Sequence, residues 1–169
     1  MDAAELRATQ APIKDRYRTD PKSAMITLTA RGSLENEGIA CKVETGRALA
    51  IAGLHPATGG SGLELCSGDM LLEALVACAG VTLKSVATAL ELPLTAASVT
   101  AEGDLDFRGT LGVDKETPVG FAEIRLRFDV DTPAPQDKLD LLLKLTESYC
   151  VVYQTIKHGP KVSVTMQRA

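Results

Sequence analysis

The sequence predicts an α+β domain in which an antiparallel sheet packs its apolar face against two helices. Two observations lead to this prediction. Long apolar segments with helical periodicity occupy residues 67–90 and 136–156, and the segments around them alternate apolar and polar residues as half-buried strands do. In chain order the elements are three strands, a helix, two strands, a helix and a strand (βββ-α-ββ-α-β).

The N-terminal segment, residues 1–23, is charged and weakly helical, and Asp20-Pro21 ends it. We expect it to form an arm or a short capping helix outside the core. The remaining residues, 24–169, are expected to form a single domain, because the sequence has no internal repeat and no second domain boundary.

Alternation and turn residues predict three strands before the first long helix. They cover residues 24–32, 39–45 and 47–52, with a turn at 33–38 and a glycine-rich loop at 55–62. The same patterns predict strands at 98–110 and 121–130, a second helix at 136–156 and a last strand at 161–166.

The first long helix is expected to start at Ser67, a good N-cap residue, with Asp69 placed where a carboxylate suits the helix dipole. It is apolar on nearly all sides up to Leu83 and ends near Leu90. A helix without a polar face is buried, so this segment is predicted to form the centre of the core.

Composition and charge exclude several classes of protein. Hydrophobic residues make up 45% of the 169-residue chain, charged residues 24%, and the net charge is −4. A chain with this charge and no basic run is a poor partner for nucleic acid or an anionic membrane. The first residues lack the apolar run of a signal peptide, and no window approaches the roughly 18 apolar residues of a membrane span. We therefore expect a cytoplasmic protein.

Four cysteines, Cys41, Cys66, Cys78 and Cys150, are the residues most open to a chemical role. In the cytoplasm they are expected to be reduced at rest. Their spacing contains no Cys-x-x-Cys and no nearby histidine, so no metal site is expected. Cys41 alternates with apolar neighbours on a predicted strand and is assigned to the core.

Cys78 lies deep in the first helix, nine residues after Asp69 and beyond the reach of the helix dipole. Burial alone raises the pKa of a thiol and makes it unreactive. A reactive Cys78 therefore needs a cation from elsewhere, and Arg31 and Arg47 are the candidates. The small residues around it, 77–80, allow two interpretations: close helix packing around an inert thiol, or a narrow pocket over a reactive one.

Cys150 lies in the second helix and allows the same two interpretations. A disulfide with Cys78 needs Cα atoms about 5.5–6 Å apart, which a sequence does not reveal. Cys66 is a rival nucleophile, because it precedes the predicted N-cap, where free N–H groups favour a thiolate. A cysteine hydrolase that pairs Cys78 with His55 or His158 is a further alternative.

Three segments, taken together, carry a family resemblance. They are Gly59-Gly60 with the helix segment Asp69-Met-Leu-Leu-Glu-Ala-Leu-Val-Ala-Cys78, the segment Thr146-Glu-Ser-Tyr-Cys150-Val-Val, and the strand segment Gly120-Phe-Ala-Glu-Ile-Arg-Leu. These segments resemble the OsmC/Ohr family of osmotically inducible and organic-hydroperoxide-resistance proteins. The resemblance covers about residues 24–167.

The resemblance implies an OsmC-like fold: an intertwined homodimer whose antiparallel sheets wrap around two long central helices per chain. It also implies thiol-dependent reduction of organic hydroperoxides. Cys78 matches the peroxidatic cysteine, and Cys150 matches the resolving cysteine that converts the resulting sulfenic acid to a disulfide. A dithiol reductant, in the family often lipoyl-linked, restores the pair by exchange. No metal or flavin cofactor is implied.

The chain departs from the family pattern at the start of the first helix. The family usually has Pro-Glu there, and the glutamate holds an arginine beside the sulfur, whereas this chain has Ser67 and Gly68. Asp69, one position later, is the expected substitute, with Arg31 or Arg47 as its arginine. The alternative function is a non-catalytic protein of the same fold that binds a small apolar ligand in the dimer crevice.

Overall fold

The computed structural model describes residues 3–34, 41–43, 52–63 and 65–168, with the backbone alone for 3–7, 28–34 and 41–43. Its strands are β1 (Met25–Leu34), β2 (Cys41–Val43), β3 (Ala96–Asp106) and β4 (Phe121–Asp131). They form one antiparallel sheet in the order β2-β1-β3-β4. The predicted α+β class and the antiparallel sheet are therefore confirmed.

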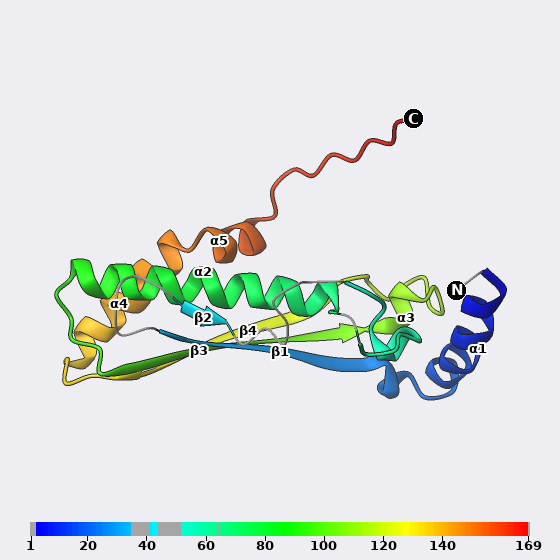
Figure 1. Ribbon diagram of the computed structural model, residues 1–169, viewed down its shortest axis with the longest axis horizontal. Coiled ribbons are helices and arrows are strands. Elements are labelled where there is room, and N and C mark those ends of the chain that lie inside the picture. Colours follow the sequence, from blue (N-terminus) through cyan, green and yellow to red (C-terminus); the bar gives the residue numbers. More distant parts are fainter. Residues whose placement is uncertain (1–2, 35–40, 44–51, 64, 169) are drawn as a thin grey trace.

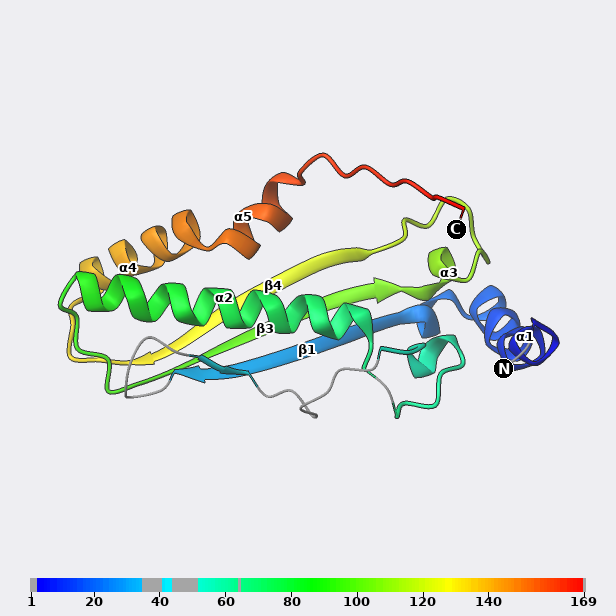
Figure 2. The ribbon, with the colours of Figure 1, turned by 45° about the horizontal axis from the view of Figure 1, so that its top comes forward.

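The helices pack on one face of this sheet and at one of its ends. They are α1 (Ala3–Thr19), α2 (Ser67–Ala89), the short α3 (Phe107–Thr110), α4 (Gln136–Tyr149) and α5 (Val151–His158). α2 runs along the length of the sheet, and α4 and α5 lie beside it on the same face (Figures 1 and 2). α1 lies at the opposite end of the elongated molecule from α4.

The main core lies between α2 and the middle of the sheet. Its buried members include Leu72, Leu75, Val76 and Ala79 of α2 with Val99, Ala101 and Leu105 of β3. α2 is also long and apolar enough to cross a membrane, and one side of it is buried against the sheet. The predicted position of this helix is confirmed, except that its N-cap is Cys66 rather than Ser67.

β3 and β4 show the predicted alternation. Along β3 every second residue from Val99 to Leu105 is buried, and the polar residues between them face the other side of the sheet. There Arg125 of β4 pairs with Asp104 of β3 at 2.6 Å. Its hydrogen bonds to the carboxylate lower the pKa of Asp104 to about 2. This pair ties the two strands together on the outer face and leaves the inner face to apolar contacts with the helices.

α1 is more than an arm outside the core. The side chain of Tyr17 is completely buried, belongs to the main core, and donates a hydrogen bond to the carbonyl of Ala57 at 2.7 Å. Gln10 donates to the carbonyl of Thr58 at 3.3 Å. The expectation that this segment lies outside the core is therefore wrong for its last turns, because a tyrosine can bury its ring and still satisfy its hydroxyl.

Two further predictions differ from the structure, and both concern where a periodic pattern stops. The strand predicted at 98–110 ends at Asp106 and continues as α3. The helix predicted at 136–156 is divided into α4 and α5 at Cys150. Apolar periodicity continues through both positions, so the pattern alone does not reveal the change in backbone. Most of the strand predicted at 47–52 lies outside the described residues.

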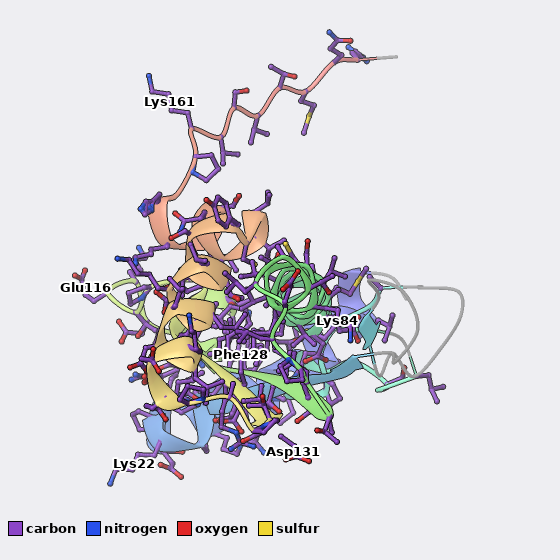
Figure 3. The ribbon with its side chains drawn as sticks, turned by 90° about the vertical axis from the view of Figure 1, so that its left-hand side faces the viewer. Lys22, Lys84, Glu116, Phe128, Asp131 and Lys161 are labelled. Atoms are coloured by element: carbon purple, nitrogen blue, oxygen red, sulfur yellow. The ribbon has the colours of Figure 1, made fainter. Side chains whose placement is uncertain are left out.

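The strand predicted at 161–166 is also not formed in the single chain. The segment after α5 pairs with no described strand, and Val162, Val164 and Met166 are 81%, 90% and 98% exposed. Figure 3 shows this tail, marked by Lys161, standing away from the helices and the sheet. An alternating segment becomes a strand only where a partner edge supplies hydrogen bonds.

Candidate active site

The fold brings Cys78 and Cys150 together. Cys78 lies in the middle of α2, and Cys150 lies at the junction of α4 and α5, which both pack against α2. The two side chains are within hydrogen-bonding reach of each other, and both thiols are free. Cys150 is 1% exposed, whereas Cys78 is half-buried. An oxidant from solvent therefore meets Cys78 first.

The junction at Cys150 gives this residue two structural roles. Its N–H donates to the carbonyl of Thr146 in α4 at 2.9 Å, and its own carbonyl accepts from the N–H of Gln154 in α5 at 2.9 Å. Its backbone is extended, with φ −72° and ψ 105°, so it caps the end of α4 and the start of α5. In sequence, the only hint of the break is the β-branched pair Val151-Val152, which is a weak helix former.

The surroundings of Cys150 keep its proton in place. Burial is the largest cause that raises the pKa of this thiol, and the adjacent Cys78 sulfur raises it further, to about 11. The backbone N–H groups of Tyr153 and Val152 point toward the Cys150 sulfur and act in the opposite direction, although neither makes a full capping hydrogen bond. The adjacent Cys78 sulfur thus adds to burial in keeping the proton on Cys150.

Cys78 lies at the border between the core and an exposed stripe of α2. The stripe consists of Leu71, Ala74, Cys78, Val81 and Ser85, at the i, i+3, i+7, i+10 and i+14 spacing that places residues on one helix face. Leu71 is 41% exposed and Val81 is 38% exposed. The sulfur can therefore be approached along a face of α2 that the single chain does not cover.

The predicted activating cations lie outside the described side chains. The backbone of Arg31 is placed in β1, opposite Thr100 of β3, but its side chain is not among those described. Arg47 falls within the undescribed segment 44–51. Which of the two arginines serves Cys78 therefore stays a prediction, as does the assignment of Cys41 to the core.

Asp69 has other neighbours than the expected arginine among the described residues. Burial raises the pKa of its carboxyl, and the nearby His55 acts in the opposite direction. Glu73 lies close enough for the Asp69 charge to raise its pKa, after the larger effect of burial. Asp69 also lies roughly 13 Å from Cys78 along the helix axis, at 1.5 Å per residue. It can act on the sulfur only through an intermediary side chain.

His55 has a fixed orientation that the sequence does not indicate. Its Nδ1 accepts a hydrogen bond from the N–H of Ala57 at 3.0 Å, so the neutral ring carries its proton on Nε2. The ring stacks on Phe107, with centroids 4.9 Å apart. Its position next to Asp69, a long way along α2 from Cys78, gives no support to a Cys78–His55 hydrolase pair.

Cys66 occupies the N-cap of α2, where a helix N-terminus favours negative charge. Its side chain is half-buried and packs against the main core. It lies twelve residues before Cys78, roughly 18 Å along the helix axis. The two thiols therefore cannot share one site, and Cys66 is a separate thiol rather than a partner of the pair.

The space beside the Cys150 sulfur is closely filled. A cavity of about 10 Å³ lies beside Cys150, lined by Ala79, Leu126, Phe128, Thr146, Glu147 and Tyr153. It has room for at most one water molecule. Among the described residues, no cluster of three or more histidine, cysteine and acidic side chains could hold a metal ion.

The position of the Cys150 proton gives a test by alkylation. In a Cys41→Ser/Cys66→Ser background, the additional Cys78→Ser change removes one of the causes that raise the pKa of Cys150. We expect the pH profile of Cys150 alkylation by iodoacetamide to move to lower pH in the triple variant. The alkylation of the folded protein is quenched first. The protein is then unfolded and digested, and peptide mass spectrometry measures how much Cys150 has reacted at each pH. An unchanged or higher apparent pKa contradicts the interaction between the two sulfurs.

Known proteins resemble this chain in sequence profile and in fold. The sequence profile of the OsmC-like protein family matches residues 60–165, a segment that contains both Cys78 and Cys150. The fold is similar to the crystal structure of an OsmC-like hydroperoxide resistance protein from Jannaschia sp. CCS1, with a TM-score of 0.63. That match covers 86% of this chain and 95% of the other at 14% identity. No curated protein matches the sequence. The chain belongs to the OsmC-like protein family.

Proposed function

We propose that this protein is a thiol peroxidase that reduces organic hydroperoxides in the cytoplasm. Cys78 is the attacking thiolate, and Cys150 is the resolving thiol. The observation that carries the proposal is the direct contact between one accessible and one buried thiol within an OsmC-like fold. Family membership supports hydroperoxide reduction in general, and the contact supports these two residues in particular.

The reaction needs two thiols and no other redox group. The Cys78 thiolate attacks the distal oxygen of the hydroperoxide, the O–O bond breaks, and the alkoxide leaves as an alcohol after taking up a proton. Cys78 is then a sulfenic acid. The Cys150 sulfur attacks the Cys78 sulfur, and the sulfenic oxygen leaves as water. An external dithiol, of which a lipoyl group is the proposed example, reduces the disulfide by two exchange steps.

The electrostatics of Cys150 suit the order of these steps. While Cys78 carries negative charge, its sulfur helps to keep the proton on Cys150. Conversion of Cys78 to a neutral sulfenic acid removes that contribution. The N–H groups of Val152 and Tyr153 remain, and they favour the Cys150 thiolate. The resolving thiol is therefore easier to ionise after the peroxide has reacted than before.

We further propose that Arg31 or Arg47 supplies the positive charge beside Cys78, as the family resemblance implies. A thiol with an ordinary pKa near 8.5 is about 3% ionised at pH 7, so a nearby guanidinium increases the reactive fraction many-fold. Asp69 is the proposed carboxylate that orients the arginine. The electrostatic effect of His55 on Asp69 is the observation that favours the alternative, a non-catalytic protein of this fold that binds a small apolar ligand.

A second copy of the chain is proposed to complete the site. α2 is the most apolar helix of the described chain, yet only 39% of the residues in its most apolar stretch are buried. Cys78 is part of its exposed stripe. The tail after α5 has an unpaired strand pattern, and β4 has β3 as its one described partner. We propose that the stripe packs against a second copy, and that each tail pairs with the β4 edge of the other copy.

The peroxidase proposal predicts a clear order among variants. With cumene hydroperoxide and a dithiol reductant, Cys78→Ser is expected to lose at least a thousandfold in activity, because the nucleophile is absent. Cys150→Ser is expected to react once with peroxide and to stop as a Cys78 sulfenic acid, which dimedone traps. Cys66→Ser is expected to keep wild-type activity. Equal turnover by Cys78→Ser and wild type contradicts the proposal.

The same assay separates the two arginines. Arg31→Ala or Arg47→Ala is expected to slow the reaction of Cys78 with peroxide, and the slow variant identifies the activating cation. Wild-type rates in both single variants and in the double variant contradict an arginine-activated thiolate. Stoichiometric inertness of the wild-type protein toward peroxide favours the ligand-binding alternative.

The dimer proposal predicts a difference between two surface valines. Val81, 38% exposed, lies in the stripe, whereas Val119, 72% exposed, lies in the loop between α3 and β4. We expect wild type and Val119→Glu to sediment as dimers of a 17.8 kDa chain, and Val81→Glu to sediment as a monomer, because a charge there cannot be buried without a partner. A monomeric wild type at micromolar concentration contradicts the proposal.

A further inference from the structure

The junction of α4 and α5 is closed by a side chain. The Nε2 of Gln154 donates to the carbonyl of Glu147 at 2.7 Å, across seven residues of sequence. In a continuous helix the N–H of Val151 would bond that carbonyl. The break at Cys150 removes this partner, and an amide side chain from the first turns of α5 replaces it.

Other side-chain hydrogen bonds near the junction stay within one helix. Thr146 and Ser148 donate to carbonyls of their own helix, Leu142 and Lys144, both at 2.8 Å. Among the described residues, the side-chain hydrogen bond that crosses the break is that of Gln154. It links α5 to the last turn of α4 and so helps to set the angle between the two helices.

That angle decides where the Cys150 sulfur lies. The break places Cys150 at the N-terminus of α5, with the N–H groups of Val152 and Tyr153 toward its sulfur and with Cys78 in contact. In a continuous helix those N–H groups would be bonded within the helix and unable to act on a thiolate. The adjacent cavity of about 10 Å³ leaves the sulfur little room to find another position.

We propose that Gln154 is a positioning residue for the resolving cysteine, acting by its hydrogen bond to Glu147. This inference rests on the proposed function, in which Cys150 attacks an oxidised Cys78. Gln154 has no part in the first step, because Cys78 belongs to α2 and reacts from the exposed stripe. Loss of the bond is therefore expected to slow resolution and to leave the first oxidation unchanged.

The test separates the two steps without a hydroperoxide. In a Cys41→Ser/Cys66→Ser background, 4,4′-dithiodipyridine reacts with the accessible Cys78 and releases one thiopyridone. Cys150 then attacks the Cys78 sulfur and displaces a second thiopyridone, which closes the disulfide. Absorbance in a stopped-flow instrument records both phases.

Gln154→Leu and Gln154→Glu remove the donor, and Gln154→Lys keeps one. We expect the first two to slow the second phase about fivefold to tenfold, the effect of one lost hydrogen bond to a partly buried carbonyl, with the first phase unchanged. Gln154→Lys is expected to recover most of the rate. The matched control is Gln136→Leu, whose amide donates to Asp140 at 2.8 Å on the exposed surface of α4, and both of its phases should match the parent.

An unchanged second phase in natively folded Gln154→Leu overturns the inference, as does an equal slowing of both phases. If Gln154→Leu does not fold, the comparison of Gln154→Glu with Gln154→Lys carries the same test. Failure of the peroxidase proposal is recognised separately, because wild-type protein would then show both thiopyridone phases but no reaction with cumene hydroperoxide.

Discussion

The contact between the Cys78 and Cys150 sulfurs is the interaction on which the proposed chemistry of this chain depends. Two constraints produce it. Packing of α2 against the sheet and against the C-terminal helices beside it brings the two thiols to one place. The break between α4 and α5 then turns the Cys150 sulfur toward Cys78 and toward free N–H groups. Neither helix alone would make its cysteine reactive.

The position of Cys78 is compatible with its proposed reactivity, although the helix around it is almost entirely apolar. The side of α2 that carries Leu72, Leu75 and Val76 is buried against the sheet, whereas the side that carries Leu71 and Val81 is exposed. Cys78 lies where these two surfaces meet. In the proposed dimer the exposed side is covered as well, so a partner chain limits access to the sulfur and shapes the path of the substrate.

Much of the fold could be predicted from periodicity, because α2, β3 and β4 bury one continuous apolar face and their patterns are long. The break at Cys150 could not, since apolar periodicity runs through it and the hydrogen bond that closes it joins Gln154 to a backbone carbonyl. The tail after α5 has a strand pattern but pairs with none of the described strands of its own chain. The buried Tyr17 lies in a segment whose charge indicates exposure. For the site, the two cysteines could be named from sequence, but the raised pKa of Cys150 follows from its three-dimensional surroundings.

Peptide mapping after a single oxidation tests the central claim most directly. Reduced wild-type protein receives one equivalent of cumene hydroperoxide without a reductant, is alkylated in denaturant, and is digested for mass spectrometry. The account predicts that the chain loses two hydrogens, that the peptide with Cys78 is linked to the peptide with Cys150, and that Cys66 remains alkylated. A chain that consumes no peroxide, or a disulfide that contains Cys66 in place of Cys150, contradicts it.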